Sequence, residues 1–164
     1  MAVSLLREMK AVGIPTDAVT YGSLIDACGR SGETDRIFPI FDEMEADDLN
    51  PNSVCYKLAL WGFKAKKDWD GVRKTLSRIR KAFPKNLVYL RTMHIDALCE
   101  AAREGEAELA LEVLSYFHCT KLLIDDHVLK NVVKACLEAG KGSLAQELRE
   151  IIEASKNPNV SHSR

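Results

Sequence analysis

The sequence has 164 residues, of which 46% are hydrophobic and 29% charged, with a formal net charge of −1. No window approaches the roughly 18 to 20 apolar residues of a membrane helix, which excludes a transmembrane span. The five cysteines form no CxxC pair, so we expect no disulfide framework. Cys28, Cys99 and Cys136 lie in apolar helical patterns, and we interpret these three as small core residues in a reducing compartment.

The small net charge hides a strong asymmetry along the chain. Residues 1–52 contain 4 basic and 10 acidic side chains, whereas residues 53–87 contain 10 basic and 2 acidic ones. Because a local excess of positive charge attracts negative partners, any affinity for a polyanion should centre on the middle third of the sequence.

The first expected element is a helix over residues 2–12. Its sequence LLREM at residues 5–9 returns as IFDEM at residues 40–44, a step of 35 residues. At residues 40–44 this sequence belongs to the second half of a helical hairpin, so residues 1–17 should hold the second helix of a truncated repeat. We therefore expect a fragment of a longer array or a degenerate amino-terminal cap.

Internal repeats organise the rest of the chain. Val19 and Val54 are 35 residues apart, and so are Tyr21 and Tyr56. The sequence LIDAC at residues 24–28 is echoed by IDALC at 95–99 and by VVKAC at 132–136. A fixed step of this length is typical of solenoid proteins built from small supersecondary units.

Each unit is predicted as helix, turn, helix and loop. Apolar residues in 21–28 and 37–44 follow the i, i+3, i+4, i+7 spacing of a helix. Gly32 separates the two helices, and Pro51 ends the unit because its ring disfavours helix at the preceding residue. A single hairpin cannot bury its apolar stripes, so neighbouring hairpins must stack.

We predict an all-α chain with four units, at residues 18–52, 53–87, 88–125 and 126–156, before a disordered tail at residues 157–164. Three irregularities accompany this prediction. Pro39 lies inside an expected helix, where it should cause a kink. Residues 66–68, Lys-Lys-Asp, stand where a turn glycine is expected. The third unit is three residues longer than the first two, and we place the extra length in its inner turn at residues 103–106.

The repeat closely resembles the pentatricopeptide repeat family. The resemblance is carried by GIPTDAVTYGSLIDACGRSG at residues 13–32, FDEM at 41–44 and LNPN at 49–52. It is close in the first unit and looser in the other three. The 35-residue step and the Val-Thr-Tyr opening differ from tetratricopeptide repeats, whose period is 34 residues. The resemblance implies a right-handed α-solenoid of stacked antiparallel hairpins.

The resemblance also implies which residues contact single-stranded RNA, since such repeats read one base per unit through a few side chains. In each unit the fifth and last residues face the base edge, and the second packs against base faces. The implied residues are Val19, Gly22 and Asn52 in the first unit, Val54, Lys57 and Leu87 in the second, Tyr89, Thr92 and Asp125 in the third, and His127 and Lys130 in the fourth.

These positions depart from the family's usual pattern of Asn, Thr or Ser at the fifth place and Asp, Asn or Ser at the last. Only Thr92 with Asp125 fits both, a pair that resembles the guanine-favouring combination. Gly22 and Leu87 offer no side-chain hydrogen bond, and the flexible ammonium of a lysine discriminates bases poorly. We therefore expect little sequence specificity from this segment.

A basic cluster in the middle third supports three interpretations: a phosphate track, a solvated outer helix face, or a docking patch for an acidic partner or structured RNA. Most of its members fall on the second helix of their hairpin, which in this family usually lines the outer surface. Its members are Lys64, Lys66, Lys67, Arg73, Lys74, Arg78, Arg80, Lys81 and Lys85.

Other residues give weaker signals. Trp61, Trp69 and Tyr89 have ring faces that bases stack on, although aromatic residues at helical spacing more often belong to the core. The histidines show no metal-ligand spacing. No phosphate-binding loop, nucleophile elbow, zinc-deaminase motif or nuclease-type aspartate cluster is present. We expect a non-catalytic protein with no cofactor and no metal.

Two functions remain open at this point. The resemblance favours an RNA-binding protein of a mitochondrion or plastid, with single-stranded or ribosomal RNA bound on the concave face. The irregular reading positions favour the alternative, an accessory subunit or scaffold that binds protein subunits in a large organellar complex such as a ribosome or a bioenergetic complex. No transit peptide is visible ahead of the first expected helix.

Overall fold

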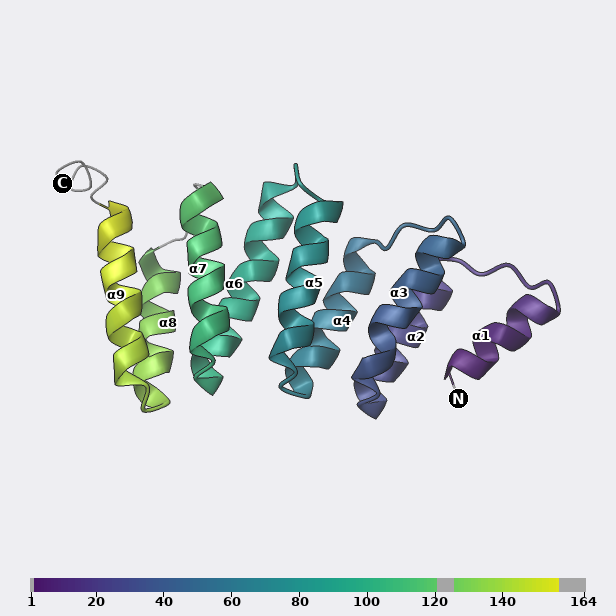
Figure 1. The fold of residues 1–164 in the computed structure, drawn as a ribbon, viewed down its shortest axis with the longest axis horizontal. Helices are drawn as coiled ribbons and strands as arrows, with labels where there is room; N and C mark the ends of the chain where they lie inside the picture. Colours follow the sequence, from purple (N-terminus) through teal and green to yellow (C-terminus); the bar gives the residue numbers. More distant parts are fainter. Residues whose placement is uncertain (1, 121–125, 157–164) are drawn as a thin grey trace. The chain divides into compact units, whose positions relative to one another are not determined.

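The computed structural model describes residues 2–120 and 126–156, and all regular structure in these ranges is helical (Figure 1). None of these helices has the length and apolar character of a membrane span. In chain order they are α1 (Ala2–Ala11), α2 (Ala18–Ser31), the 3-10 helix η1 (Thr34–Arg36), α3 (Ile37–Ala46), α4 (Ser53–Ala65), α5 (Trp69–Ala82), α6 (Leu87–Glu104), α7 (Ala107–Thr120), α8 (Asp126–Glu138) and α9 (Gly142–Lys156).

The chain forms two compact units that divide between Ile79 and Arg80. In the first unit, α2 packs against α3, its partner in the hairpin, and against α4, the first helix of the next hairpin. In the second unit, α6 packs against α7 and α8, and α9 packs against α7 and α8. Among the described residues, each unit is therefore held together by contacts between neighbouring helices, which is the packing predicted for stacked hairpins.

Polar side chains fix where the first helices of the hairpins begin. The Asp17 carboxylate accepts a hydrogen bond from the Thr20 backbone N–H at 2.8 Å and caps α2. Asn52 caps α4 in the same way, accepting from two backbone N–H groups. Such caps satisfy donors that have no partner within the helix, and each contributes about 1 kcal/mol.

Pro39 occupies the first turn of α3. The predicted kink inside a longer helix is therefore wrong. The short 3-10 helix η1 precedes α3, which begins at Ile37. Pro39 is thus the third residue of α3, where a backbone N–H would have no acceptor within the helix. The missing N–H costs nothing at this position, so the helix starts next to the proline and needs no bend.

The extra residues of the third unit lengthen α6 and leave its inner turn short, contrary to the prediction. Helix α6 has 18 residues, compared with 14 in α2 and 13 in α4. It ends at Gly105, whose φ of 79° is the left-handed conformation that closes many helices. Glu106 alone then separates this glycine from α7. Added helical residues keep their backbone hydrogen bonds, which an enlarged loop would have lost.

A close helix contact in the first unit joins two glycines. A Cβ placed on Gly62 would lie 2.8 Å from the Gly29 Cα, and one placed on Gly29 would lie 3.0 Å from the Gly62 Cα. Both values are well below ordinary van der Waals separation. Helices α2 and α4 can therefore approach this closely only because neither position carries a side chain.

The cysteines do not all lie in the core. Cys28, Cys55 and Cys136 are buried and reduced, and burial raises the pKa of each thiol. Cys99 is only partly buried, and Cys119 is exposed. The prediction of small core residues is therefore confirmed for Cys28 and Cys136 and is only partly correct for Cys99, whereas Cys55 is a buried thiol that it did not include.

Candidate nucleic-acid interface

Counting from the helix caps gives each hairpin a common frame. Asp17, Asn52 and Asn86 are the caps of α2, α4 and α6. The fourth residue after each cap is buried, and these residues are Tyr21, Tyr56 and Leu90, with exposed fractions of 0%, 3% and 2%. In α8 the fourth residue from the start is Leu129, which is also buried. The frame therefore aligns the buried stripe of all four first helices.

The second residue of each first helix is exposed. Val19, Val54 and Val88 expose 74%, 57% and 78% of their surface. His127 holds the same place in α8 and is exposed as well. Isolated surface valines are common, but here the same repeat position carries an exposed valine twice in the first unit and once in the second.

The frame shifts the predicted register of the third unit by one residue. Asn86 accepts from the Tyr89 backbone N–H at 3.1 Å, so α6 begins at Leu87 and the predicted boundary between residues 87 and 88 moves to between 86 and 87. Val88 and Arg91 then correspond to Val54 and Lys57. The sequence analysis placed Tyr89 and Thr92 at these positions because Tyr89, next to Leu90, resembles the tyrosine of the earlier repeats.

The residues predicted for this unit have other surroundings. Tyr89 is half-buried, with its ring edge against Phe83 at a centroid distance of 5.0 Å. Thr92 is exposed and donates its hydroxyl to the Val88 carbonyl at 2.9 Å. Leu87 is the first residue of α6, and Asp125 lies outside the described residues. Tyr89 and Thr92 remain predicted contacts, one residue further along α6 than the frame indicates.

Three of the four fifth positions carry cations. Lys57 and Lys130 are exposed, and Arg91 is partly exposed. Gly22 is buried, and a Cβ there would make only ordinary contacts with Cys55 and Leu58 of α4. Cations at this position attract phosphate or base acceptors but provide little geometric discrimination.

Asn52 uses its carbonyl oxygen within the fold. Its Oδ1 accepts from the Val54 and Cys55 backbone N–H groups at 2.9 and 3.0 Å. The amide Nδ2 of this exposed side chain is therefore the atom suited to donate to a base. Asn86, the equivalent residue before α6, is also an exposed cap.

We refer to the exposed side of the first helices as the first-helix surface. Its members in the first unit are Val19, Ser23, Arg30, Val54, Lys57 and Trp61. Its members in the second unit are Val88, Arg91, Thr92, His127 and Lys130.

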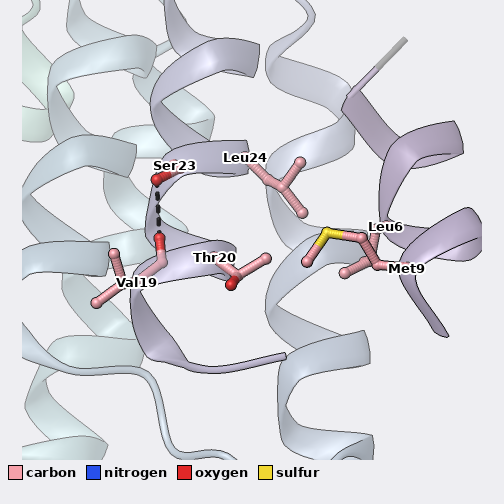
Figure 2. A pocket seen from close by; sticks show the side chains of 6 residues that line it. All are labelled: Leu6, Met9, Val19, Thr20, Ser23 and Leu24. Atoms are coloured by element: carbon pink, nitrogen blue, oxygen red, sulfur yellow. Dashed lines mark hydrogen bonds between the residues drawn. The ribbon is translucent and has the colours of Figure 1, made fainter. Parts of the chain in front are cut away.

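A small cavity borders this surface in the first unit. It has a volume of about 280 Å³ and lies between α1 and α2. Figure 2 shows Leu6, Met9 and Leu24 projecting toward it, with the Ser23 hydroxyl turned back to the Val19 carbonyl. The Ser23 oxygen is 2.9 Å from that carbonyl, so its proton is already donated within the helix. The cavity is thus mainly an apolar gap between two helices.

The comparisons with known proteins agree with this geometry. Residues 4–64 match the family model of the pentatricopeptide repeat domain. Residues 4–64 therefore belong to the pentatricopeptide repeat family. It also resembles the crystal structure of the pentatricopeptide repeat protein PPR10 from maize, at 25% sequence identity and a TM-score of 0.67. The predicted family and the predicted fold class, an α-solenoid of helical hairpins, are confirmed. Its handedness and number of units remain predictions.

The likeness to the maize pentatricopeptide repeat protein has a defined extent. The match covers 98% of this chain but only 22% of the maize protein. A search of curated proteins found no significantly similar sequence. The comparisons thus describe a set of pentatricopeptide repeats and leave open what the whole protein contacts.

The basic cluster is partly neutralised by carboxylates of the same chain. Arg78 donates to Asp42 at 2.6 Å, and its guanidinium lies over the Phe38 ring at 5.3 Å. In the second unit, Arg80 lies 3.3 Å from Glu112. Such pairs reduce the positive potential that α5 presents to a polyanion.

Other members of the cluster differ in their pairing. Lys74 pairs with Asp70 at 2.6 Å and lowers the pKa of that carboxyl group, and Arg73 is within 4.0 Å of the same residue. Among the described residues, Lys66, Lys81 and Lys85 form no ion pair and are exposed, Lys67 is exposed, and Lys64 is half-buried near the end of α4.

Trp61 does not belong to the core of its pentatricopeptide repeat, although the sequence favoured that interpretation. It exposes 48% of its surface on the same side of α4 as Val54 and Lys57. Trp69, the first residue of α5, is half-buried. The spacing of Trp61, four residues after Lys57 and seven after Val54, was a sequence signal for this exposure.

Proposed function

We propose that this pentatricopeptide repeat protein binds single-stranded RNA on its first-helix surface and catalyses no reaction. One observation carries the proposal. Val19, Val54 and Val88 occupy the same repeat position and are 57% to 78% exposed. An apolar residue exposed once has little meaning, but one exposed at the same repeat position three times, twice in the first unit and once in the second, suits a ligand with flat apolar faces, as unpaired bases have.

The cations of the first-helix surface supply the complementary charge. Lys57 is three residues after Val54 on α4, and Lys130 is three residues after His127 on α8. A base packed on the second residue therefore brings its phosphate within reach of the fifth, because residues three apart are neighbours on a helix. Each phosphate so neutralised releases counterions, which makes the affinity depend on salt.

Low sequence selectivity is part of the proposal. Gly22 has no side chain to offer, and the lysines at two other fifth positions form undirected hydrogen bonds. Good base contacts are worth about 1 to 3 kcal/mol each. With most fifth positions lacking such contacts, the chain should bind unstructured RNAs of different sequence with similar affinity.

Fluorescence anisotropy with short labelled unstructured RNAs tests the proposal. Binding at low ionic strength should weaken linearly on a log–log plot against salt, with a slope of about −0.7 for each neutralised phosphate. Lys57→Ala and Lys130→Ala should each reduce the slope by about 0.7 to 1. Lys81→Ala and Lys85→Ala are the matched controls, because these lysines are not on the first-helix surface. Absence of binding at low salt contradicts the proposal and favours the protein scaffold.

A second pair of variants tests the register of the third unit. Arg91→Ala should weaken RNA binding more than Thr92→Ala if the helix caps define the repeat, because Arg91 then stands in the place of Lys57. The reverse order would restore the register predicted from the sequence. Thermal unfolding of both variants shows whether either change acts through stability.

We also propose an organellar location, in a mitochondrion or plastid, on the strength of the family resemblance. A tagged full-length protein should then fractionate with mitochondria or plastids and resist protease until the organelle is lysed. Recovery in the cytosol alone would contradict the location without affecting RNA binding in vitro.

A further inference from the structure

We infer that Trp61 is a stacking platform for an unpaired RNA base, held beside Arg30 between two successive repeats. This inference rests on the proposed function and adds a contact outside the second, fifth and last positions of the repeat. Trp61 is the ninth residue of α4 and exposes 48% of its surface, a large fraction for an indole in a packed helical array.

The backbone of α2 supports the indole. A Cβ on Gly29 would lie 3.7 Å from Cε3 of Trp61, so the ring lies next to a position with no side chain. The same glycine makes the close contact with Gly62 that sets the spacing of the two helices. The ring therefore lies against a well-packed helix junction.

Arg30 extends the support on the neighbouring helix. Its guanidinium lies over the Trp61 ring, 5.9 Å from the ring centroid, within the usual range of a cation–π interaction. The Nε of Arg30 also donates to Asp26 at 2.8 Å, which orients the guanidinium. Side chains fixed in this way lose little conformational entropy when a ligand arrives.

Packing of the repeat does not require an aromatic residue at this place. The ninth residue is Asp26 in α2, Ile95 in α6 and Lys134 in α8. These residues differ in charge and shape, so the ninth position tolerates many side chains. An exposed indole in α4 alone is thus better explained by a ligand than by the fold.

The charges nearby select the kind of ligand. Lys57 is exposed one turn before Trp61 on α4, and Arg30 adds a second cation at the ring. Asp26 offsets part of the Arg30 charge and leaves Lys57 as the main phosphate contact. An aromatic face beside cations fits a base joined to a phosphate, the combination used by proteins that bind single strands.

The chain allows a direct optical test, because it contains two tryptophans, Trp61 and Trp69. In Trp69→Phe, Trp61 is the sole indole fluorophore. Addition of an unstructured RNA should quench its fluorescence in parallel with the anisotropy signal of binding. An abasic oligomer of the same length keeps the phosphates and lacks the bases, so it should bind more weakly and leave Trp61 fluorescence nearly unchanged.

Affinity gives the second measurement. Trp61→Ala should weaken RNA binding by about 5- to 150-fold, the range that corresponds to losing one base–aromatic stack. The salt slope should stay the same because no phosphate contact is removed, and Trp61→Phe should retain most of the affinity. Circular dichroism checks that the alanine variant is folded, and the quenching experiment does not depend on that variant.

The outcomes separate this inference from the proposed function. If RNA binds by anisotropy but Trp61 is not quenched, or is quenched equally by the abasic oligomer, the platform is refuted and RNA binding stands. Unchanged affinity in Trp61→Ala would refute it as well. If no RNA binds at all, both the stacking platform and the proposed function are refuted.

Discussion

The two units pack the same kind of hairpin with different side chains. In the first unit, the residue eight places after the cap is apolar, Ile25 in α2 and Leu60 in α4. In the second unit, α6 has His94 at this place, and its side chain is completely buried. The first unit also brings two helices together at Gly29 and Gly62, where no side chain intervenes.

This difference shows that the position in the repeat determines whether a side chain is buried but does not determine whether that side chain is apolar or polar. His94 donates from Nδ1 to the Leu90 carbonyl at 2.7 Å and stacks on Tyr116 at a centroid distance of 4.5 Å. Its Nε2 is buried without a hydrogen-bond partner among the described residues. A position that is hydrophobic in the first unit therefore carries a titratable side chain in the second, so the stability of the two units should depend differently on pH.

The largest expected effect is an acid sensitivity due to His94. Burial, with a smaller contribution from Arg80, lowers the pKa of His94 from 6.5 to about 4. The unfolded chain takes up this proton first, so stability falls as the pH drops from about 6.5 towards 4. By pH 4.5 the loss should be about 2 to 3 kcal/mol. Urea unfolding at neutral and acidic pH measures it.

His94→Leu is the matched control, since Leu60 already occupies the equivalent place in α4. The variant should be at least as stable as the natural chain at neutral pH, because it removes an unsatisfied buried nitrogen. It should also lose less stability on acidification. Parallel pH profiles for both proteins would show that the second unit owes its acid response to other groups.

An intermediate effect is expected at the glycine contact of the first unit. Gly62→Ala places a methyl group 2.8 Å from the Gly29 Cα, which is backbone and cannot rotate away. The helices must separate, at a cost of about 1 to 3 kcal/mol. Gly22→Ala, whose Cβ would be 3.8 Å from the Cys55 sulfur, should be neutral or stabilising by up to about 1 kcal/mol. Equal effects in chemical denaturation would remove the contrast.

The smallest effect concerns the turns of the two units. Lys67 in the first unit has a φ of 55°, and Gly140 in the second has a φ of 72°. Left-handed backbone costs a residue with a Cβ about 1 kcal/mol. Lys67→Gly should therefore be about 1 kcal/mol more stable than Lys67→Ala, and Gly140→Ala should lose a similar amount. The comparison of the two Lys67 variants cancels any contact made by the lysine side chain.

The sequence was sufficient to predict the helical hairpins because the repeat step and the apolar spacing recur along the chain. Tyr21 and Tyr56 mark the step between units, and the apolar spacing around them defines which side is buried. These features depend on many residues at once, so single exceptions do not disturb them. The helices, their order and their family followed from this redundancy.

Single-residue features were harder to predict. Pro39 was expected to kink a helix, but the preceding 3-10 turn places it in the first turn of α3, where it causes no kink. Trp61 was assigned to the core because an indole at helical spacing usually packs inside. In both cases the deciding fact is a local geometry of one or two residues, to which a periodic pattern is insensitive.

The hydrogen bond from the Tyr89 amide to Asn86 has a consequence for decoding. One residue along an α-helix is a rotation of about 100° around its axis, so counting from residue 88 and counting from residue 87 select side chains that point in different directions. Dividing the sequence into units of 35 residues puts Thr92 at the fifth position of the third unit, whereas counting from the capping Asn86 puts Arg91 there. The proposed register, and the order of effects expected for Arg91→Ala and Thr92→Ala, therefore depends on counting the repeat from its capping asparagine.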